Sequence, residues 1–437
     1  MSRVKAAFVK IGKGLEGLVK LLSRTEKYIL AFLLIVALAS LGLWFKELHD
    51  TYGNDQKIQV YTEGWLKNNT EKNINLGRLT KAGLTKYSSD GLIVGDLAEK
   101  WEISSDLLTY TFTLHENINP SELIETISQN GDLYGAVQTE AKDTNQIIFK
   151  LKQPYNFFLD VTTKPIFAYG PYEIERQSEL AINLVARKDY YLGQPSINKV
   201  QIKLFDNQDE LKKAYESQEI DATCDLLGEE PDARVQRVML PRFVSLFFNT
   251  TKTPLDSVDV RKKIIDGTSV ADMKLRLKLL VSNLPEVDNE LDKVVKQLTE
   301  QGVELDVVRK DPVEAFKEGI AGRDYDLLLF GIDYSNGQDY YPFWHSSQIT
   351  APGRNFTHLN NLDLDKKLEE ARMTSDMNRR QQLIAEIKDL IKSQYVEMPL
   401  KEDMILCQSS SVVENNTIGY ITVPQDRYAN IFDWTIK

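Results

Sequence analysis

The sequence is poor in the residues from which metal sites and covalent frameworks are built. It has only 2 cysteines and 4 histidines among 437 residues. Cys224 and Cys407 form no CxxC pair, which excludes zinc-ribbon and thioredoxin-like sites. Two buried free thiols are the expected state of these cysteines. A disulfide between them is the alternative, since the spacing of two cysteines along a chain does not reveal their geometry.

The motifs of common enzyme classes are also missing. The sequence contains no HExxH, GxSxG or Walker A pattern. Residues 12–17 match GxGxxG, but a dinucleotide site needs a preceding strand and a βαβ unit, and an apolar run follows instead. The histidines have no metal-ligand spacing; they are His49, His115, His345 and His358. The sequence therefore predicts a protein that is not an enzyme and that has no cofactor and no metal.

Positive charge is scarce over most of the chain. The net charge is -11, which argues against a nucleic-acid partner, because phosphate binding needs a basic face. The first 27 residues are the exception. They carry only Glu16 and Glu26 against the basic residues Arg3, Lys5, Lys10, Lys13, Lys20, Arg24 and Lys27.

An uncharged apolar run follows this basic segment, at residues 28–45. At 1.5 Å per residue it is about 27 Å long as a helix, close to the ~30 Å of a bilayer's hydrocarbon core. Tyr28 begins the run and Trp44 and Phe45 end it, where interfacial aromatic residues are expected. We therefore predict a transmembrane anchor at residues 28–46.

The basic flank also predicts the orientation of this anchor. Under the positive-inside rule, residues 1–27 lie in the cytoplasm and the chain beyond the anchor lies outside it, as a single-pass plasma-membrane protein. A signal peptide cleaved after Ala39 is the alternative. The apolar run continues beyond Ala39 to Phe45, which favours an uncleaved anchor.

The remaining chain has the pattern of two α/β lobes. After a linker at residues 47–57, strand-like alternation dominates, for example at 108–114 and 199–205. Strands and helices then alternate from 275 to 330, two helices are expected at 362–374 and 376–393, and the end at 420–436 is strand-like. We predict lobe I over 58–255 plus 400–437, with a reduced subdomain near 85–165, and lobe II over 256–399. A ligand cleft between the lobes follows from this arrangement.

Several segments, in order, resemble one family. The first is residues 91–118, from Gly91 through the alternating Thr109–Leu114 to Ile118. The others are residues 170–172, 187–200, 218–222, 248–261, 324–326, 333–334, 355–357 and 398–400. Together they resemble the family 5 extracellular solute-binding proteins, the oligopeptide- and dipeptide-binding subunits of ABC importers. The resemblance covers about residues 58–437.

The resemblance implies a fold, a ligand and a site. The fold is the two-lobed periplasmic-binding-protein type with an extra small subdomain, here reduced. The ligand is a peptide or a similar solute, delivered to ABC permease subunits. The strand Phe330-Gly331-Ile332 would pair with the backbone of the peptide, and Asp333 would pair with its α-ammonium. The candidate ligand-binding residues are Phe330, Gly331, Ile332, Asp333, Tyr334 and Asn249, the last on an expected interlobe crossing at Phe248–Asn249.

The chain also departs from this family. The stretch that usually follows the first signature is missing after Ile118, and the segment after Arg261 is short. These losses leave the size of the ligand open. They also keep a second interpretation open, a degenerate binding fold that acts as a cell-surface sensor or scaffold without transport.

Overall fold

The computed structural model describes residues 58–67, 76–135, 137–283, 285–317, 322–335 and 337–437, together with Ser40. The chain divides into two compact units, Met1–Ile58 and Gln59–Lys437, and the second is described below. The predicted cytoplasmic segment 1–27, the linker 47–57 and, apart from Ser40, the anchor 28–46 lie outside the described residues. Within the described ranges, no helix combines the length and the apolar character that a membrane span requires.

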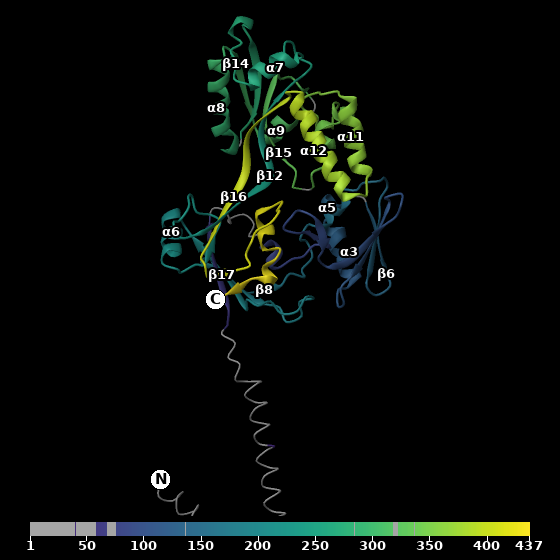
Figure 1. The fold of residues 1–437 in the computed structure, drawn as a ribbon, viewed down its shortest axis with the longest axis vertical. Coiled ribbons are helices and arrows are strands. Elements are labelled where there is room, and N and C mark those ends of the chain that lie inside the picture. The colour runs from purple at the N-terminus through teal and green to yellow at the C-terminus, as the bar shows by residue number, and fades with distance from the viewer. Residues whose placement is uncertain are drawn as a thin grey trace, which may run out of the picture. The chain divides into compact units, whose positions relative to one another are not determined.

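A mixed sheet of ten strands runs through the second unit (Figure 1), in the order β14-β13-β15-β12-β16-β11-β1-β10-β9-β8. We call the β14 side lobe II, with β14 (Glu304–Lys310), β13 (Arg276–Ser282) and β15 (Leu327–Asp333). We call the β8 side lobe I, with β11 (Ala222–Thr223), β1 (Val60–Leu66), β10 (Lys199–Phe205), β9 (Ala181–Ala186) and β8 (Tyr172–Gln177). Two long strands, β12 (Arg234–Phe248) and β16 (Glu397–Ser409), belong to both lobes.

These two strands, which we call the hinge strands, carry the chain between the lobes. They pair with each other along most of their length, and their register shifts between Met239 and Phe243 of β12. The chain enters lobe II through this part of β12 and returns through β16. The crossing predicted at Phe248–Asn249 is therefore wrong, because Phe248 already lies fully buried in the core of lobe II.

Lobe II has helices on both faces of its sheet. The helices α7 (Val258–Ile265) and α8 (Pro285–Glu300) cover one face, and α10 (Tyr341–Trp344), α11 (Leu362–Met373) and α12 (Met377–Ser393) cover the other. The sequence predicts one apolar face on the last helix, formed by Leu383, Ile384, Ile387, Leu390 and Ile391. This is confirmed, since α12 buries all of them except Leu390, which is partly buried against the same core. Short elements complete the lobe: η3 (Ala271–Met273), α9 (Pro312–Lys317) and η5 (Ser346–Gln348).

Lobe I is covered on one face by α6 (Gln208–Glu216) and on the other by the end of the chain. This end forms β17 (Val413–Glu414), η6 (Pro424–Tyr428), η7 (Ile431–Asp433) and β18 (Thr435–Ile436). The strand predicted at 420–436 is therefore mostly wrong. Tyr428, Ile431 and Trp434 are buried in the lobe I core, and their spacing of three residues matches a 3-10 turn rather than a strand.

A small subdomain extends lobe I. Its antiparallel sheet has the order β4-β5-β7-β6. Its elements are β4 (Ala98–Ile103), β5 (Thr109–Leu114), α3 (Pro120–Gln129), α4 (Gly131–Tyr134), β6 (Gln138–Lys142), β7 (Gln146–Lys150) and α5 (Phe158–Thr162). Alternation at 101–103 and 108–114 predicts two strands of a hairpin, and the antiparallel pairing of β4 with β5 confirms it. Tyr110, Phe112 and Leu114 are buried in the subdomain core. Before it lie η2 (Gly77–Leu79), β2 (Thr85–Tyr87) and β3 (Ile93–Gly95).

Two local predictions in this region are wrong. Apolar residues among polar neighbours predict a helix over 75–84, but the helical part of its described residues is the single turn η2. The sequence also predicts a helix over 121–128 with Ser121 as its N-cap, but α3 starts earlier. Asn119 caps it instead, accepting a hydrogen bond from the Ser121 N–H, and Pro120 occupies the first turn, where its missing N–H costs nothing.

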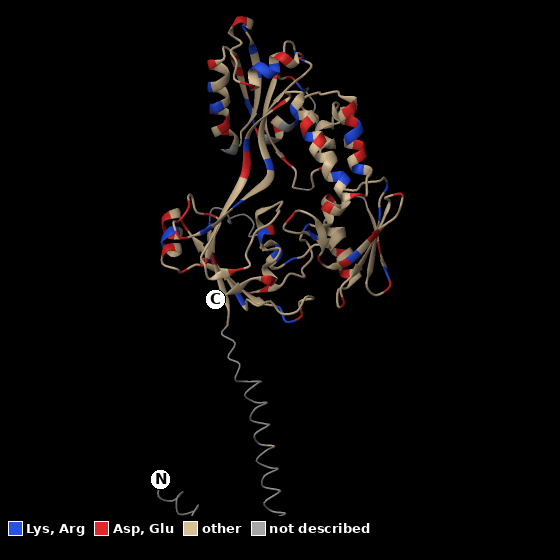
Figure 2. Cartoon of the chain, viewed as in Figure 1, with Lys and Arg blue, Asp and Glu red and all other residues tan. Residues whose placement is uncertain are grey.

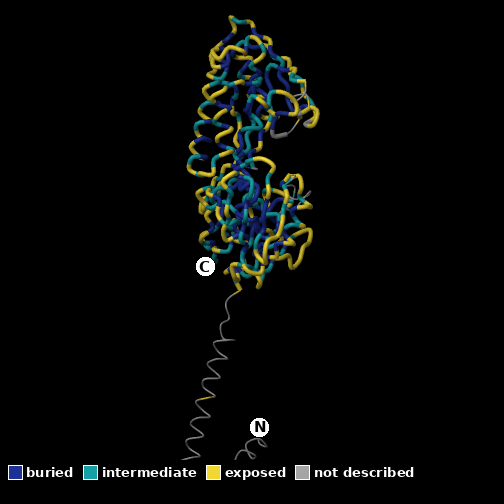
Figure 3. Tube along the Cα trace, turned by 90° about the vertical axis from the view of Figure 1, so that its right-hand side faces the viewer, coloured by how far each residue is buried: buried dark blue, intermediate teal, exposed yellow. Residues whose placement is uncertain are grey.

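The distribution of burial and charge fits this layered arrangement. Buried segments lie inside both lobes, and exposed segments lie at their periphery (Figure 3). Acidic and basic residues are interspersed on α11 and α12 (Figure 2), where Arg379 forms ion pairs with Glu370 and Glu386. Most charged side chains of these two helices thus lie on their solvent side.

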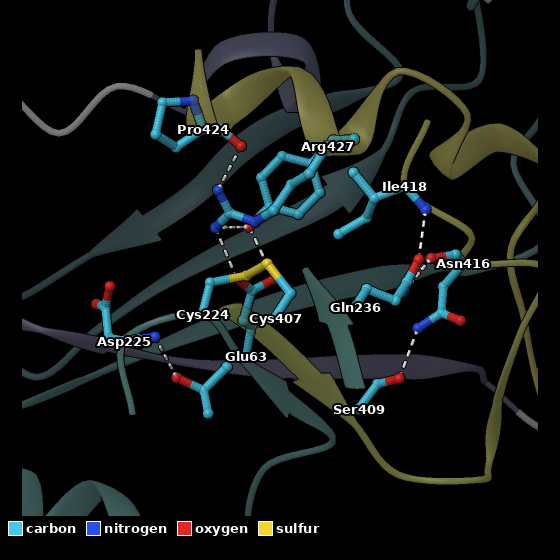
Figure 4. Close-up of a disulfide and its surroundings, with 12 residues drawn as sticks. Glu63, Cys224, Asp225, Gln236, Cys407, Ser409, Asn416, Ile418, Pro424 and Arg427 are labelled. Atoms are coloured by element: carbon cyan, nitrogen blue, oxygen red, sulfur yellow. Dashed lines mark hydrogen bonds and ion pairs between the residues drawn. A yellow bond between two sulfur atoms is a disulfide. The ribbon is translucent and has the colours of Figure 1, made fainter. Parts of the chain in front are cut away.

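The two cysteines form a disulfide, with Cα atoms 4.0 Å apart (Figure 4). The preference for free thiols is therefore wrong. The cause is strand register: Ala222 pairs with Ser409 and Thr223 with Gln408, so the next residues, Cys224 and Cys407, lie opposite each other. Sequence could not reveal this, because 183 positions separate the two cysteines.

Candidate ligand site beside the hinge strands

The end of β15 lies directly beside the hinge strands. β15 runs antiparallel to β12, so that Asp333 pairs with Arg242 and Gly331 with Val244. On its other side, the ladder to β13 ends at Leu329, and β15 continues beyond it to Asp333. The structure thus places the predicted residues 330–334 together at the boundary between the lobes.

This strand end presents backbone rather than large side chains. Ile332 is buried in the lobe II core, and Phe330 packs against the same core. Gly331 is exposed, and a Cβ atom placed there would meet nothing nearer than the Phe243 carbonyl oxygen at 3.8 Å. A glycine at such a strand position allows another backbone to approach closely.

Tyr334 has a structural role in the core. Its side chain is 7% exposed, and its hydroxyl accepts a hydrogen bond from the indole Nε1 of Trp344 at 3.0 Å. Its ring stacks on Tyr340, with ring centroids 4.6 Å apart. Burial raises the pKa of Tyr334 well above its ordinary value. These contacts fix the turn that follows Asp333.

The structure does not bring Asn249 to this place. Phe248 pairs with Leu327 at the opposite end of β15, so Asn249 lies roughly 20 Å from Asp333 along the strand direction. Both ends of its amide are bonded within lobe II: Nδ2 donates to the Tyr325 carbonyl at 2.9 Å, and Oδ1 accepts from the N–H and the hydroxyl of Thr251. Asn249 therefore stabilises the loop after β12.

Asp333 is paired with a cation that sequence reasoning missed. Its Oδ2 lies 3.3 Å from Nε of Arg242. Nη1 of the same guanidinium lies 3.8 Å from Oδ2 of Asp403. Its Oδ1 accepts the N–H of Ser335 at 2.7 Å. Arg242 stands in the register shift of β12, and no motif marks it. Only the pairing of β12 with β15 reveals its position.

A second cation, Lys164, reaches the same loop from lobe I. Its Nζ donates to the carbonyl of Ser335, and it also donates to Oγ1 of Thr422 at 3.1 Å. Burial lowers the pKa of Lys164, while the neighbouring carboxylates of Asp426, Asp333 and Asp160 oppose this shift. Lys164 follows α5 in the sequence, and no pattern pointed to it.

An ion pair and a hydrogen bond connect the segment around α5 with lobe II. Asp160 on α5 lies 2.7 Å from Arg380 on α12, and it also accepts the hydroxyl of Tyr87. Arg372 on α11 lies 2.6 Å from Asp339. The Tyr155 hydroxyl donates to the same Asp339 carboxylate. Charged side chains of both lobes therefore meet in the region that the predicted cleft would occupy.

A separate cavity of about 440 Å³ lies in the subdomain. Its wall includes Leu133, Tyr134, Val137, Leu151, Tyr155, Phe158 and Val161, with Asp132, Lys152 and Gln153. No predicted site residue lines it. Within the described ranges, no group of three or more histidine, cysteine, aspartate or glutamate side chains is arranged to hold a metal ion.

Comparison with known proteins supports the fold and the family. Residues 124–264 match the model of the bacterial extracellular solute-binding proteins, family 5 Middle. Comparison with curated protein sequences gives no match.

Solved structures match over most of the chain. HbpA2 from Haemophilus parasuis has a TM-score of 0.71 at 14% identity, covering 87% of this chain and 100% of that one. The oligopeptide-binding protein AppA from Bacillus subtilis, in complex with a nonapeptide, has a TM-score of 0.59 at 16% identity, covering 87% and 100%. NikZ from Campylobacter jejuni, in complex with Ni(L-His), has a TM-score of 0.59 at 16% identity, covering 86% and 99%.

The described fold is thus the α/β fold of the periplasmic-binding-protein type. The resemblance to the family 5 extracellular solute-binding proteins is confirmed for residues 124–264 by the family match, and the solved structures show the same fold over the unit as a whole.

Proposed function

We propose that this protein is an extracytoplasmic solute-binding protein that captures peptides between its two lobes and delivers them to ABC permease subunits. It performs no catalysis and needs no cofactor. Residues 28–46 anchor it in the plasma membrane with the N-terminus in the cytoplasm. The disulfide supports an extracytoplasmic location for the folded unit, because such bonds persist in oxidising compartments.

One observation carries the peptide proposal. The end of β15 continues past the ladder to β13 and presents the exposed Gly331 beside the hinge strands. An extended peptide placed along such a strand end gains main-chain hydrogen bonds that do not depend on its sequence. Asp333 stabilises the backbone that follows this strand end, because its carboxylate pairs with Arg242 and accepts a hydrogen bond from the Ser335 N–H.

A thermal-shift experiment tests this proposal. The folded unit is heated with a mixed library of short peptides, half with free amino termini and half N-acetylated. A ligand present at 100 times its dissociation constant stabilises the folded state by about 2.7 kcal/mol, so the melting temperature rises by several degrees. Asp333→Ala should abolish the rise, because Arg242 and the Ser335 turn lose their partner.

Asp324→Ala is the matched control for this variant. Asp324 precedes the same strand at the end opposite to Asp333, is exposed, and pairs with Lys278 at 2.7 Å. It should leave the shift unchanged. If no peptide of either form stabilised the wild type, the degenerate-fold alternative, a sensor or scaffold without transport, would replace the present proposal.

A further inference from the structure

The loop that follows β15 is held by cations from the chain itself. One carboxylate oxygen of Asp333 forms an ion pair with Arg242, and the other accepts a hydrogen bond from the Ser335 N–H. The Ser335 carbonyl oxygen accepts a hydrogen bond from the Lys164 ammonium. The same ammonium also donates to the hydroxyl of Thr422 in lobe I. An ammonium group of the protein thus bridges the lobes within two residues of Asp333.

The position of Lys164 is fixed by a connected polar network. Asp426 accepts hydrogen bonds from the backbone N–H and the hydroxyl of Thr422, and Arg78 pairs with the same carboxylate at 3.3 Å. Arg78 and Asp426 are both buried. The network therefore runs from the buried Arg78 in lobe I through Thr422 and Lys164 to the Asp333 turn in lobe II.

We propose that Lys164 sets the ligand class of this site, which takes peptides or peptide-like solutes that have no free α-ammonium at the Asp333 end. This proposal rests on the proposed function. The ammonium of Lys164 already satisfies the Ser335 carbonyl, and Arg242 already neutralises Asp333. An incoming α-ammonium would meet an Asp333 carboxylate that is already paired, with the cations Arg242 and Lys164 beside it, and like charges that close repel.

A neutral N-blocked end avoids this repulsion. Its carbonyl oxygen can accept a hydrogen bond, which the donors of Lys164 and Arg242 supply. Burial lowers the pKa of Lys164, and the charges of Asp426, Asp333 and Asp160, which favour its protonated form, offset this shift only in part. The proposed selectivity therefore depends on an ammonium that the surrounding carboxylates stabilise.

Paired binding measurements test this inference. Each peptide of a defined set is prepared with a free amino terminus and as its N-acetyl form, and both are titrated by calorimetry. For the wild type we expect the N-acetyl form to bind at least about tenfold more tightly. For Lys164→Met, which keeps the length of the side chain without its charge, we expect this ratio to fall by at least about tenfold. Lys152→Met, at an exposed lysine of the subdomain, should leave the ratio unchanged.

The outcomes separate the inference from the function on which it rests. Equal affinities in the wild type, or tighter binding of the free amines, would overturn the role of Lys164 while leaving peptide capture intact. Binding of neither form would contradict the proposed function and this inference with it.

A second measurement needs neither a ligand nor a variant. The wild type is treated with a limiting amount of an amine-acylating reagent, and the labelling of each lysine is read by mass spectrometry. Lys164 should be labelled at least about tenfold more slowly than Lys152. Equal rates would show that the bridging contact does not exist, and they would overturn the inference whatever the peptides do.

Discussion

Asp160 and Arg380 form a buried ion pair between the subdomain and lobe II, with Oδ2 and Nη1 2.7 Å apart. The two side chains are only 5% and 6% exposed. The guanidinium of Arg380 also lies over the ring of Phe157, 4.8 Å from its centroid. The α5 segment thus contacts α12 through both charge and apolar packing.

Removing one partner of this pair should destabilise the protein strongly. Asp160→Asn leaves the buried charge of Arg380 without compensation, and we expect the free energy of unfolding to fall by about 3–5 kcal/mol. Urea denaturation measures this loss. The double variant Asp160→Asn/Arg380→Met should recover part of it, because it removes the orphaned charge. Asp132→Asn, at an exposed position of the subdomain, is the control. A loss below 1 kcal/mol in Asp160→Asn would contradict the burial of the pair.

The disulfide should contribute to stability through the unfolded chain. It joins residues 183 positions apart, and the chain-entropy relation gives an upper limit of about 5 kcal/mol for a loop of this length. We expect Cys224→Ser/Cys407→Ser to melt well below the wild type under oxidising conditions. Adding a reductant should lower the melting temperature of the wild type towards that of the variant. A reductant effect of equal size in the double variant would rule out the disulfide as its cause.

Glu63 should be the most sensitive position of the lobe I core. Its carboxylate is 1% exposed and accepts hydrogen bonds from Tyr61, Trp65, Arg427 and Tyr428. Glu63→Gln would leave Arg427 buried without a counter-charge, at a cost of about 3–5 kcal/mol in the free energy of unfolding. Chemical denaturation measures this cost. The exposed Glu116, changed to Gln, serves for comparison, and similar losses in both variants would refute the argument.

His358 should make stability depend on pH below neutrality. Burial, together with the charges of Arg323 and Lys252, lowers its pKa to about 4 in the folded protein. The unfolded chain therefore binds a proton first as pH falls, and the contribution of the neutral imidazole is lost between about pH 6.5 and 4. Since the side chain is partly exposed, we expect about 1–2 kcal/mol after discounting for solvent screening.

The test for His358 is a difference between two pH profiles. His358 has a φ of 55°, a left-handed conformation that asparagine tolerates, so His358→Asn keeps the backbone. As pH falls from 7 to 4, the free energy of unfolding of the wild type should fall by about 1–2 kcal/mol relative to that of His358→Asn. Glu397 has the opposite effect on the pH dependence of stability, because burial raises its pKa. The difference between the two profiles removes this effect, since both proteins contain Glu397. Parallel profiles over this range would contradict the prediction.

Much of the fold could be predicted from local patterns. Alternation identifies Thr109–Leu114 and Lys199–Phe205 because each has one face in a core, with the burial following every second residue. The pattern near 275–281 predicts a strand that alternates at first and is then continuously apolar. This strand corresponds to β13, which is covered by helices on both faces. The two late helices were also predicted within two residues of their ends.

The hinge strands escaped prediction for a physical reason. Only the second half of β12, near Phe243–Phe248, has a strand-like pattern, since it alone lies in a core. The first half is partly exposed between the lobes, and Pro241 stands at the register shift, so no alternation or apolar run marks it. β12 pairs with residues of β16 that are roughly 160 positions away in the sequence, so the pattern of neighbouring residues does not reveal this pairing.

The candidate site was predicted only in part for the same reason. The segment 330–334 could be found because its residues are consecutive. Lys164 and Arg242 come from other elements, and only the packing of α5 and the register of β12 against β15 bring them to Asp333. Asn249 was selected by the family resemblance, but it follows Phe248, which pairs with Leu327 at the end of β15 opposite to Asp333.

The disulfide also changes what a break in the chain can do. Cys224 lies before β12 and Cys407 lies near the end of β16, so the covalent loop that they close contains the whole of lobe II. A protease that cuts once anywhere in that lobe cannot release a fragment, because both pieces stay attached to lobe I. Lobe II is thus a looped insertion in lobe I, and the disulfide joins the two points between which it is inserted.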